Sequence, residues 1–271
     1  MTIEQTEDEG HIVLGYTNSD DGDVTGHHGY EDIWLVKLNK YGNVQWSKSI
    51  GGSLPDKASF MQRLNMGKYM IIGYTMSNDG DAVGNHGNED VWVIEFQEDG
   101  QIVQKKCFGG QSTDIGGKII QMEDGGYIIL SLIYSRDGDV SDNHGISDIW
   151  IVKTDDLLGI EWEKCLGGGG SEGARGVQVG MNGGYVIFGT TNSRDIPGYH
   201  AGWMEIFVVK IDENGVVQWQ KCLGGSGWDD VGVKMFQTDN GGYVIFGYSD
   251  SNDGDIMGNH GAWDVCILRL K

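Results

Sequence analysis

The chain has 271 residues, of which 46 are glycine and only 2 are proline, and its formal net charge is −21. This length allows a sizeable core, and the acidic balance opposes binding to nucleic acid or anionic lipid. No run of 18 apolar residues exists, so we expect no membrane insertion. Residues 1–9 lack the basic and apolar regions of a signal peptide.

A segment of about 58 residues recurs almost five times along the chain. A tyrosine after a glycine-rich turn marks this period, with a histidine in its place in the first repeat: His11, Tyr69, Tyr127, Tyr185 and Tyr243. A period of this size indicates a modular array. We therefore expect a single domain over residues 1–271, built from repeats at about 1–52, 53–110, 111–168, 169–225 and 226–271.

Each repeat predicts four short strands and no helix. Glycine-rich turns separate apolar runs that are short enough for strands, and the Asp-Gly-Gly sequence at 124–126 is a hairpin signal because glycine reaches positive φ without cost. We call the segment between the second and third strands the long loop, and the segment between repeats the linking turn. In the third repeat the expected strands are 116–121, 127–132, 148–153 and 160–165.

Four antiparallel strands per repeat predict an all-β fold, a five-bladed β-propeller with one blade per repeat. The chain opens on an expected inner strand at 2–6, and the fifth repeat ends with its third strand at 263–270. The last blade is therefore expected to lack its outer strand. An all-β solenoid is the alternative fold, and the chain could also be a segment of a longer propeller or take the missing strand from a partner; otherwise we expect a monomer.

Aromatic and cysteine positions also follow the repeat. The third strands carry Trp34, Trp92 and Trp150, which we expect to pack between blades, with Phe207 at the fourth position and Cys266 at the fifth as a small buried hydrophobe. Cys107, Cys165 and Cys222 share one repeat position. They lie on separate modules, so pairing among them is not expected, and free thiols favour a reducing setting.

The segment from Gln220 to Asp264 resembles a known repeat. Its Lys-Cys-Leu-Gly-Gly, Asp-Asn-Gly-Gly-Tyr and Asn-Asp-Gly-Asp motifs look like the bacterial β-propeller repeat family, the seven-bladed β-propeller-type repeats of Bacteroidetes and Clostridia surface and secreted proteins. The resemblance covers essentially the whole chain. It implies a propeller fold and a secreted or cell-surface location, and it implies no catalytic residues.

The long loop repeats the pattern Ser-x-Asp-Gly-Asp-x-x-Gly-x-His-Gly-x-x-Asp. Calcium prefers roughly six to eight hard oxygen ligands in a flexible loop, so carboxylates at this spacing suggest a calcium site, although the spacing is not that of an EF-hand. The expected ligands are Asp21, Asp23 and Asp32 in the first repeat, then Asp79, Asp81, Asp90, Asp137, Asp139, Asp148, Asp253, Asp255 and Asp264.

A further acid follows each linking turn. In an antiparallel blade the linking turn and the long loop emerge on the same face, so these acids are possible additional ligands: Asp56, Asp114, Glu172 and Asp229. Histidine is a poor calcium ligand and is expected to anchor the loop by hydrogen bonds. The loop histidines are His28, His86, His144, His200 and His260.

Pure turn architecture is the alternative to calcium. Aspartate and asparagine cap their own turns, and a structureless loop of this length needs internal bonding. A zinc site lacks a second nearby histidine. The fourth loop departs from the pattern, since the Gly-Asp pair is deleted, an extra residue follows His200, and Glu205 replaces the last aspartate.

For function, the repetition of near-identical polar groups favours a non-catalytic binding or scaffold module with calcium-binding loops, and not an enzyme. A carbohydrate-binding propeller is one alternative, because Tyr30, Trp203, Trp228 and Trp263 lie in or beside loops of one face. A protein-interaction platform is another. Glycoside hydrolysis by paired carboxylates remains a third hypothesis, but catalysis requires one asymmetric constellation of groups.

Overall fold

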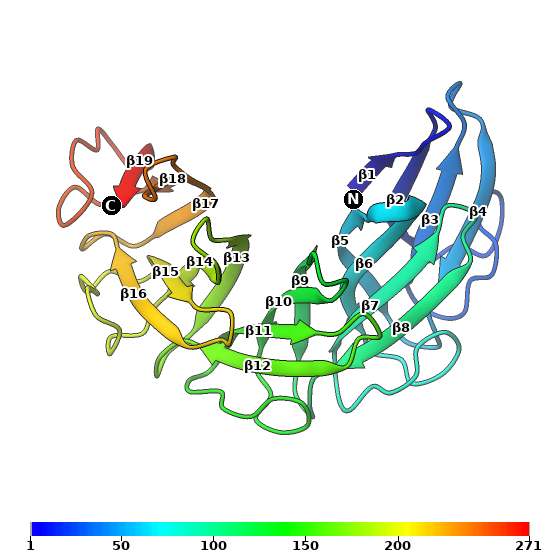
Figure 1. Ribbon diagram of the computed structural model, residues 1–271, viewed down its shortest axis with the longest axis horizontal. Coiled ribbons are helices and arrows are strands. Elements are labelled where there is room, and N and C mark those ends of the chain that lie inside the picture. Colours follow the sequence, from blue (N-terminus) through cyan, green and yellow to red (C-terminus); the bar gives the residue numbers. More distant parts are fainter. Residues whose placement is uncertain (1, 271) are drawn as a thin grey trace. The chain divides into compact units, whose positions relative to one another are not determined.

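The computed structural model describes residues 2–270, which form antiparallel strands and one short 3₁₀ turn, η1 (Asn65–Gly67) (Figure 1). The strands of the first two sheets are β1 (Thr2–Gln5), β2 (His11–Thr17), β3 (Asp32–Leu38) and β4 (Val44–Ile50), then β5 (Asp56–Arg63), β6 (Lys68–Thr75), β7 (Asp90–Gln97) and β8 (Ile102–Phe108). The third and fourth sheets contain β9 (Asp114–Gln121), β10 (Tyr127–Ile133), β11 (Asp148–Thr154) and β12 (Ile160–Leu166), then β13 (Glu172–Val179), β14 (Tyr185–Thr191), β15 (Glu205–Ile211) and β16 (Val217–Leu223). The fifth sheet contains β17 (Asp230–Gln237), β18 (Tyr243–Ser249) and β19 (Asp264–Leu270).

The strands of each sheet follow one another in chain order, in four sheets of four strands and a fifth of three. The predicted fold class is confirmed: the protein is all-β, with the sheets of a five-bladed β-propeller and no outer strand beside β19 among the described residues. The expected strands agree with the observed ones to within about two residues at each end.

Glycine makes the tight hairpin between β9 and β10 possible. Gly125 has φ of +92°, its N–H bonds to the carbonyl of Met122 at 3.1 Å, and the N–H of Met122 bonds to the carbonyl of Gly126 at 2.9 Å. A side chain at Gly125 would be strained in this left-handed conformation. The Asp-Gly-Gly sequence therefore predicts this turn because glycine can adopt the backbone conformation that the turn requires.

A β-bulge lies at the same place in the first strand of the second, third, fourth and fifth sheets. The strand that follows skips one residue there, and the skipped residues recur with the period of the sequence: Ser59, Gly117, Arg175 and Val233. A bulge increases the local twist of a strand. The bulges in these four sheets thus recur with the same period as the sequence repeat.

The chain divides into two compact units, each with its own apolar core. The first contains the chain up to Ser141 with Lys153–Glu161, and the second contains Asp142–Val152 with the chain from Trp162. Fully buried Ile71, Trp92 and Ile94 belong to the first core. Burial of one such side chain contributes roughly 1.5–3 kcal/mol. The second core includes Val186, Ile206, Val208, Met235 and Ile245.

Within the first unit, outer strands bond to the repeat that follows them. The indole Nε1 of Trp46 donates to the carbonyl of Glu98 at 3.2 Å, and Nζ of Lys48 donates to the carbonyl of Gly100 at 3.1 Å, each across 52 residues. Two further bonds span the same 52 residues, from Gln104 to Asp156 and from Lys106 to Leu158. Successive sheets are therefore joined by equivalent bonds.

The positions singled out for packing behave mostly as expected. Trp92, Trp150 and Phe207 are buried, whereas Trp34 is half-buried and its Nε1 donates to Oγ of Ser47 at 2.8 Å. The expectation for Cys266 was wrong, because this thiol on β19 is half-buried. In the fourth sheet, β16 pairs with the outer edge of β15. The corresponding edge of β19 has no strand beside it among residues 2–270. No helix in this range is long and apolar enough to cross a membrane.

Candidate functional site

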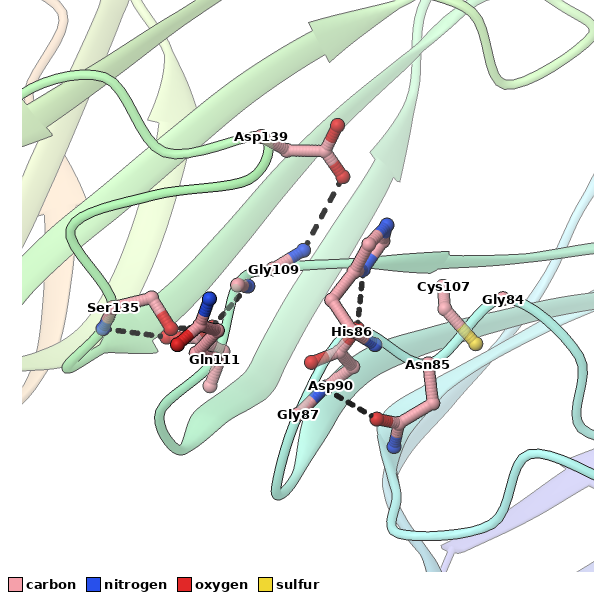
Figure 2. Close-up of polar contacts among 12 residues, drawn as sticks. Gly84, Asn85, His86, Gly87, Asp90, Cys107, Gly109, Gln111, Ser135 and Asp139 are labelled. Atoms are coloured by element: carbon pink, nitrogen blue, oxygen red, sulfur yellow. Dashed lines mark hydrogen bonds and ion pairs between the residues drawn. The ribbon is translucent and has the colours of Figure 1, made fainter.

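The long loop of the second repeat closes on a buried carboxylate at the start of β7 (Figure 2). Oδ2 of Asp90 accepts a hydrogen bond from the backbone N–H of His86 at 2.9 Å and lies 2.6 Å from Nδ1 of the same residue. Burial raises the pKa of Asp90 to about 6, although the bonds from His86 lower it, and the charge of Asp114 adds to the rise. One residue therefore fixes the loop to the strand.

A second buried carboxylate, Asp114 at the start of β9, faces this one. It accepts hydrogen bonds from the N–H of Gly110 at 2.9 Å, from Oγ of Ser135 at 2.6 Å and from the N–H of Tyr134 at 3.1 Å. A Cβ on Gly109 would lie 2.6 Å from Oδ2 of Asp114 and 3.0 Å from Oδ1 of Asp90. Glycine is required here because both carboxylates occupy the space of a side chain.

This pairing of two acids recurs wherever one sheet follows another, and we call each such place a junction. The histidine-bonded acids are Asp32, Asp90, Asp148 and Glu205, and the acids that bind the linking turns are Asp56, Asp114, Glu172 and Asp230. The last turn is one residue longer, so Asp230 holds the place that the spacing gave to Asp229. At the start of β19, His260 and Asp264 form the same pair at 3.3 Å, but both are exposed to solvent.

In the second, third and fifth repeats, the first aspartate of the Asp-Gly-Asp motif ties the loop to the preceding linking turn. Oδ1 of Asp79 accepts the N–H of Ser53 at 2.8 Å. Equivalent bonds reach Asp137 from Gln111 at 2.8 Å and Asp253 from Ser226 at 2.7 Å. In the first repeat the exposed Asp21 accepts Oγ of Ser19 at 3.0 Å, and Asp23 is also exposed.

The second aspartate of the motif has mixed partners. Asp81 forms an ion pair with Lys105 at 3.3 Å, and Oδ2 of Asp139 accepts the N–H of Gly109 at 3.3 Å (Figure 2). Oδ2 of Asp255 accepts the N–H of Gly224 at 3.4 Å. Asp139 and Asp255 thus help to hold the turns that precede their loops, whereas Asp81 pairs with a strand lysine.

The expected calcium ligands thus have separate partners. Across residues 2–270, no group of three His, Cys, Asp or Glu side chains is placed to hold a metal ion. One oxygen of each histidine-bonded aspartate is nevertheless buried without a hydrogen-bond partner in this part of the chain: Oδ1 of Asp32, Asp90 and Asp148. Calcium binding stays a prediction.

The junction between the fourth and fifth sheets departs from the others. The fourth loop has its extra residue at Ala201, which adopts a left-handed φ of +73°, and the hydroxyl of Tyr199 donates to the carbonyl of Gly202. Strained backbone of this kind collects at functional sites. The long loop and the linking turn have therefore both changed length at this one place.

Two exposed tryptophans meet at this junction. The rings of Trp203 and Trp228 lie 6.1 Å apart at 31°. Their backbones are joined, since the N–H groups of Trp203 and Met204 both donate to the carbonyl of Trp228, at 3.1 and 2.9 Å. The rings are 62% and 72% exposed and line a depression of about 220 Å³, together with Arg194, Ala201, Gly202, Ser226 and Gly227.

Two carboxylates stand beside this depression. Oδ1 of Asp250 accepts the N–H of Asp229 at 3.0 Å and occupies the space of a side chain at Gly227. Burial raises the pKa of Asp229, and the charges of Asp250 and Asp230 add to the rise. A carboxyl with a raised pKa beside a second carboxylate is suited to acid–base chemistry.

The preceding junction has neutral residues at the same two positions. There the N–H of Ser171 donates to Oδ1 of Asn192 at 2.7 Å, in place of the bond from Asp229 to Asp250. The backbone geometry is thus retained while two neutral side chains are replaced by acids.

Sequence reasoning found the tryptophans of this site but missed Arg194 and Asp250. The two length changes were the available signal, since they fall at one junction. The other loop aromatics lie elsewhere: Trp263 packs on Tyr248 at 5.2 Å, and Tyr30 is 70% exposed.

Comparisons with known proteins return only distant similarities. No family model and no curated protein matches the chain. Similar solved structures include a protein of unknown function from Bacteroides caccae, with 11% identity over 94% of this chain and 89% of that one, at a TM-score of 0.40. Others are a GH43 β-xylosidase/α-arabinofuranosidase from a compost metagenome (14% identity, 100% and 90% coverage, TM-score 0.39) and a B. megaterium levansucrase (10%, 100% and 83%, 0.42). At these identities the likeness concerns the fold alone.

These comparisons correct two expectations from the sequence. The chain was expected to be a non-catalytic binding or scaffold module and not an enzyme, but the neighbours include a xylosidase and a levansucrase, which are enzymes. The repetition of polar groups does not by itself argue against catalysis, because one junction departs from the repeat. Membership of the bacterial repeat family is not shown by any family model, whereas the propeller-type fold is supported.

Proposed function

We propose that the protein is an enzyme that hydrolyses glycosidic bonds at the junction of the fourth and fifth sheets. One observation carries the proposal: two carboxylates, Asp229 and Asp250, replace the neutral pair of the preceding junction beside the exposed pair of Trp203 and Trp228. This is the asymmetric constellation that catalysis requires and that the other loops lack.

The two acids are suited to different tasks. Glycoside hydrolysis generally uses one protonated carboxyl and one carboxylate. Burial raises the pKa of Asp229, so its carboxyl can give a proton to the glycosidic oxygen as the bond to the anomeric carbon breaks. Asp250 takes the proton of the water that attacks this carbon. Proton exchange with solvent then restores both groups.

The tryptophan pair would hold the sugar beside these acids. The apolar face of a pyranose ring packs on an indole, and two rings joined through their backbones form a stable platform. The depression of about 220 Å³ is smaller than the roughly 300–1,000 Å³ of sites for drug-sized ligands. We therefore expect the site to hold one terminal sugar residue.

The preceding junction supplies the variants for a test. Asp229→Ser and Asp250→Asn install the residues that Ser171 and Asn192 provide there, so both variants should fold. Each should lower kcat about 10²–10⁴-fold on a nitrophenyl glycoside that the wild type cleaves. Glu123→Gln removes an exposed charge outside the site and should leave kcat unchanged. The proposal fails if the wild type cleaves no member of a broad glycoside panel, or if both variants keep full activity.

A further inference from the structure

We infer that the depression beside Trp203 and Trp228 takes a sugar that carries a carboxylate, and that Arg194 binds this group. The inference rests on the proposed function for the identity of the substrate, while the binding itself can be measured separately. It would make uronic-acid-containing saccharides the substrate class.

Arg194 is the one ionisable side chain among the residues that line the depression. It is exposed, and it forms no hydrogen bond or ion pair with any residue in the range 2–270. Its guanidinium group is therefore available to a ligand that rests on the tryptophans.

The backbone on both sides of Arg194 is held in place. Oγ of Ser193 accepts the N–H of Gly170 at 2.8 Å and donates to Glu172 at 2.5 Å, and Oδ1 of Asp195 accepts the N–H of Gly169 at 3.1 Å. The base of the arginine is thus fixed between two anchored residues. Such preorganisation lowers the entropy cost of binding.

The second and fifth repeats use this position to close their own loop, whereas the third repeat has Arg136 there. Oδ1 of Asn78 accepts the N–H of Gly84, and Oδ1 of Asn252 accepts the N–H of Gly258, both at 3.0 Å. The fourth loop has lost the Gly-Asp pair that forms this part of the loop. The residue at 194 has no loop-closing bond to make, so its side chain can face the depression.

The chemistry of the site favours an anion with a planar group. The guanidinium fork matches the two oxygens of a carboxylate and can form two parallel charge-assisted hydrogen bonds. The chain carries a net charge of −21, which opposes the approach of any anion. A local arginine offsets this repulsion for a uronic acid and contributes little to a neutral sugar.

Binding of D-glucuronate and D-glucose, measured by NMR titration of the tryptophan indole signals, tests the inference directly. The wild type should bind glucuronate at least about tenfold more tightly than glucose, the size expected for one charge-assisted pair. Arg194→Asn, which gives the residue of the second and fifth repeats, should abolish this preference without lowering the affinity for glucose. Arg194→Lys should retain part of it.

The control is Arg175→Asn, which removes the same charge from an exposed position on β13 and should leave both affinities unchanged. Higher salt should reduce glucuronate binding selectively. Equal affinity of the wild type for the two sugars, no measurable binding of either, or an unchanged preference in Arg194→Asn, would each overturn the inference.

Hydrolysis assays separate this inference from the proposed function. If the wild type binds glucuronate through Arg194 but cleaves no glycoside, the inference stands and the proposed activity is wrong. If the wild type cleaves glucosides and glucuronides with equal kcat/KM, the proposed activity stands and the inference is wrong. If both hold, Arg194→Asn should lower kcat/KM about 10–100-fold for the glucuronide only.

Discussion

Nδ1 of His86 lies 2.6 Å from Oδ2 of Asp90, and the same oxygen accepts the backbone N–H of His86. A single histidine thus closes a long loop onto a carboxylate that is fully buried at the start of β7. The corresponding pair of His260 and Asp264 is exposed by 89% and 40%. The same contact therefore occurs in buried and exposed surroundings within one chain.

Replacing this histidine should destabilise the protein in proportion to the burial of its partner. His86→Ala leaves the buried carboxylate with one hydrogen bond fewer, which should cost about 1–3 kcal/mol of the free energy of unfolding. His260→Ala removes the exposed version and should cost less than about 0.5 kcal/mol. Urea unfolding of both variants checks this, and equal losses would contradict the role given to burial.

Gly109 should tolerate no side chain. Gly109→Ala places a Cβ against both Asp90 and Asp114 and forces alanine to a φ of +150°, so a loss of roughly 2–4 kcal/mol is expected. Gly15→Ala is the matched control, because a Cβ there has nothing within 4 Å. It should be neutral or slightly stabilising. The measurement is thermal unfolding, and a neutral Gly109→Ala variant would show that the two carboxylates can move apart.

The pH dependence of stability should reflect the raised pKa of Asp90. Its folded pKa is about 6 against an ordinary value of 3.8. The folded state therefore binds the proton more tightly, and the resulting stability is fully present below about pH 4 and is lost as pH rises through 6. The loss should be on the order of 3 kcal/mol.

Asp90→Asn isolates this contribution because the amide cannot titrate. The Tm of the wild type relative to the variant should fall between pH 4 and 7. A difference in Tm that stays constant over this range would mean that the carboxyl does not titrate there. Asp56, Glu172 and Glu205 also have pKa values raised by burial, so the Tm of the variant should itself keep a residual slope of the same sign.

The four thiols should differ in reactivity. Burial raises the pKa of Cys107, Cys165 and Cys222 to about 12, so almost no thiolate forms at pH 8. Cys266 is half-buried on β19 and its pKa is raised too. A disulfide exchange reagent should titrate about one thiol slowly in the native protein and all four in urea. Rapid reaction of more than one thiol would contradict the burial of the others.

The sequence predicted the sheets well because the repeat averages over local ambiguity. An apolar run such as Tyr127–Ile133 is ambiguous alone, but its recurrence with glycine-rich turns at a fixed period selects a strand. Even the incomplete fifth sheet followed from counting strands. The half-burial of Cys266 could not be predicted in this way, because it depends on which strand lies beside β19 and not on the residue type.

The proposed site was harder to predict, because repetition directed attention to the residues that recur and not to those that depart from the repeat. In the second, third and fifth repeats, the first aspartate of the Asp-Gly-Asp motif holds a linking turn: Asp79, Asp137 and Asp253. Asp250 stands where the fourth repeat has the turn-binding Asn192, and Arg194 stands where the second and fifth repeats have the loop-closing Asn78 and Asn252. Such differences resemble ordinary drift in a single sequence. The spacing assigned Asp229 to the last linking turn, whereas Asp230 binds this turn in the structure. The difference arises because this turn is one residue longer than the others.

The bonds that join the outer strands to the following repeat have a consequence for biosynthesis. Trp46 and Lys48 both reach partners 52 residues further along the chain. A growing chain can therefore complete its first interface between sheets once the second repeat has left the ribosome, while the later repeats are still being translated. Contacts of such limited and constant range favour folding in the order of synthesis, one repeat after another.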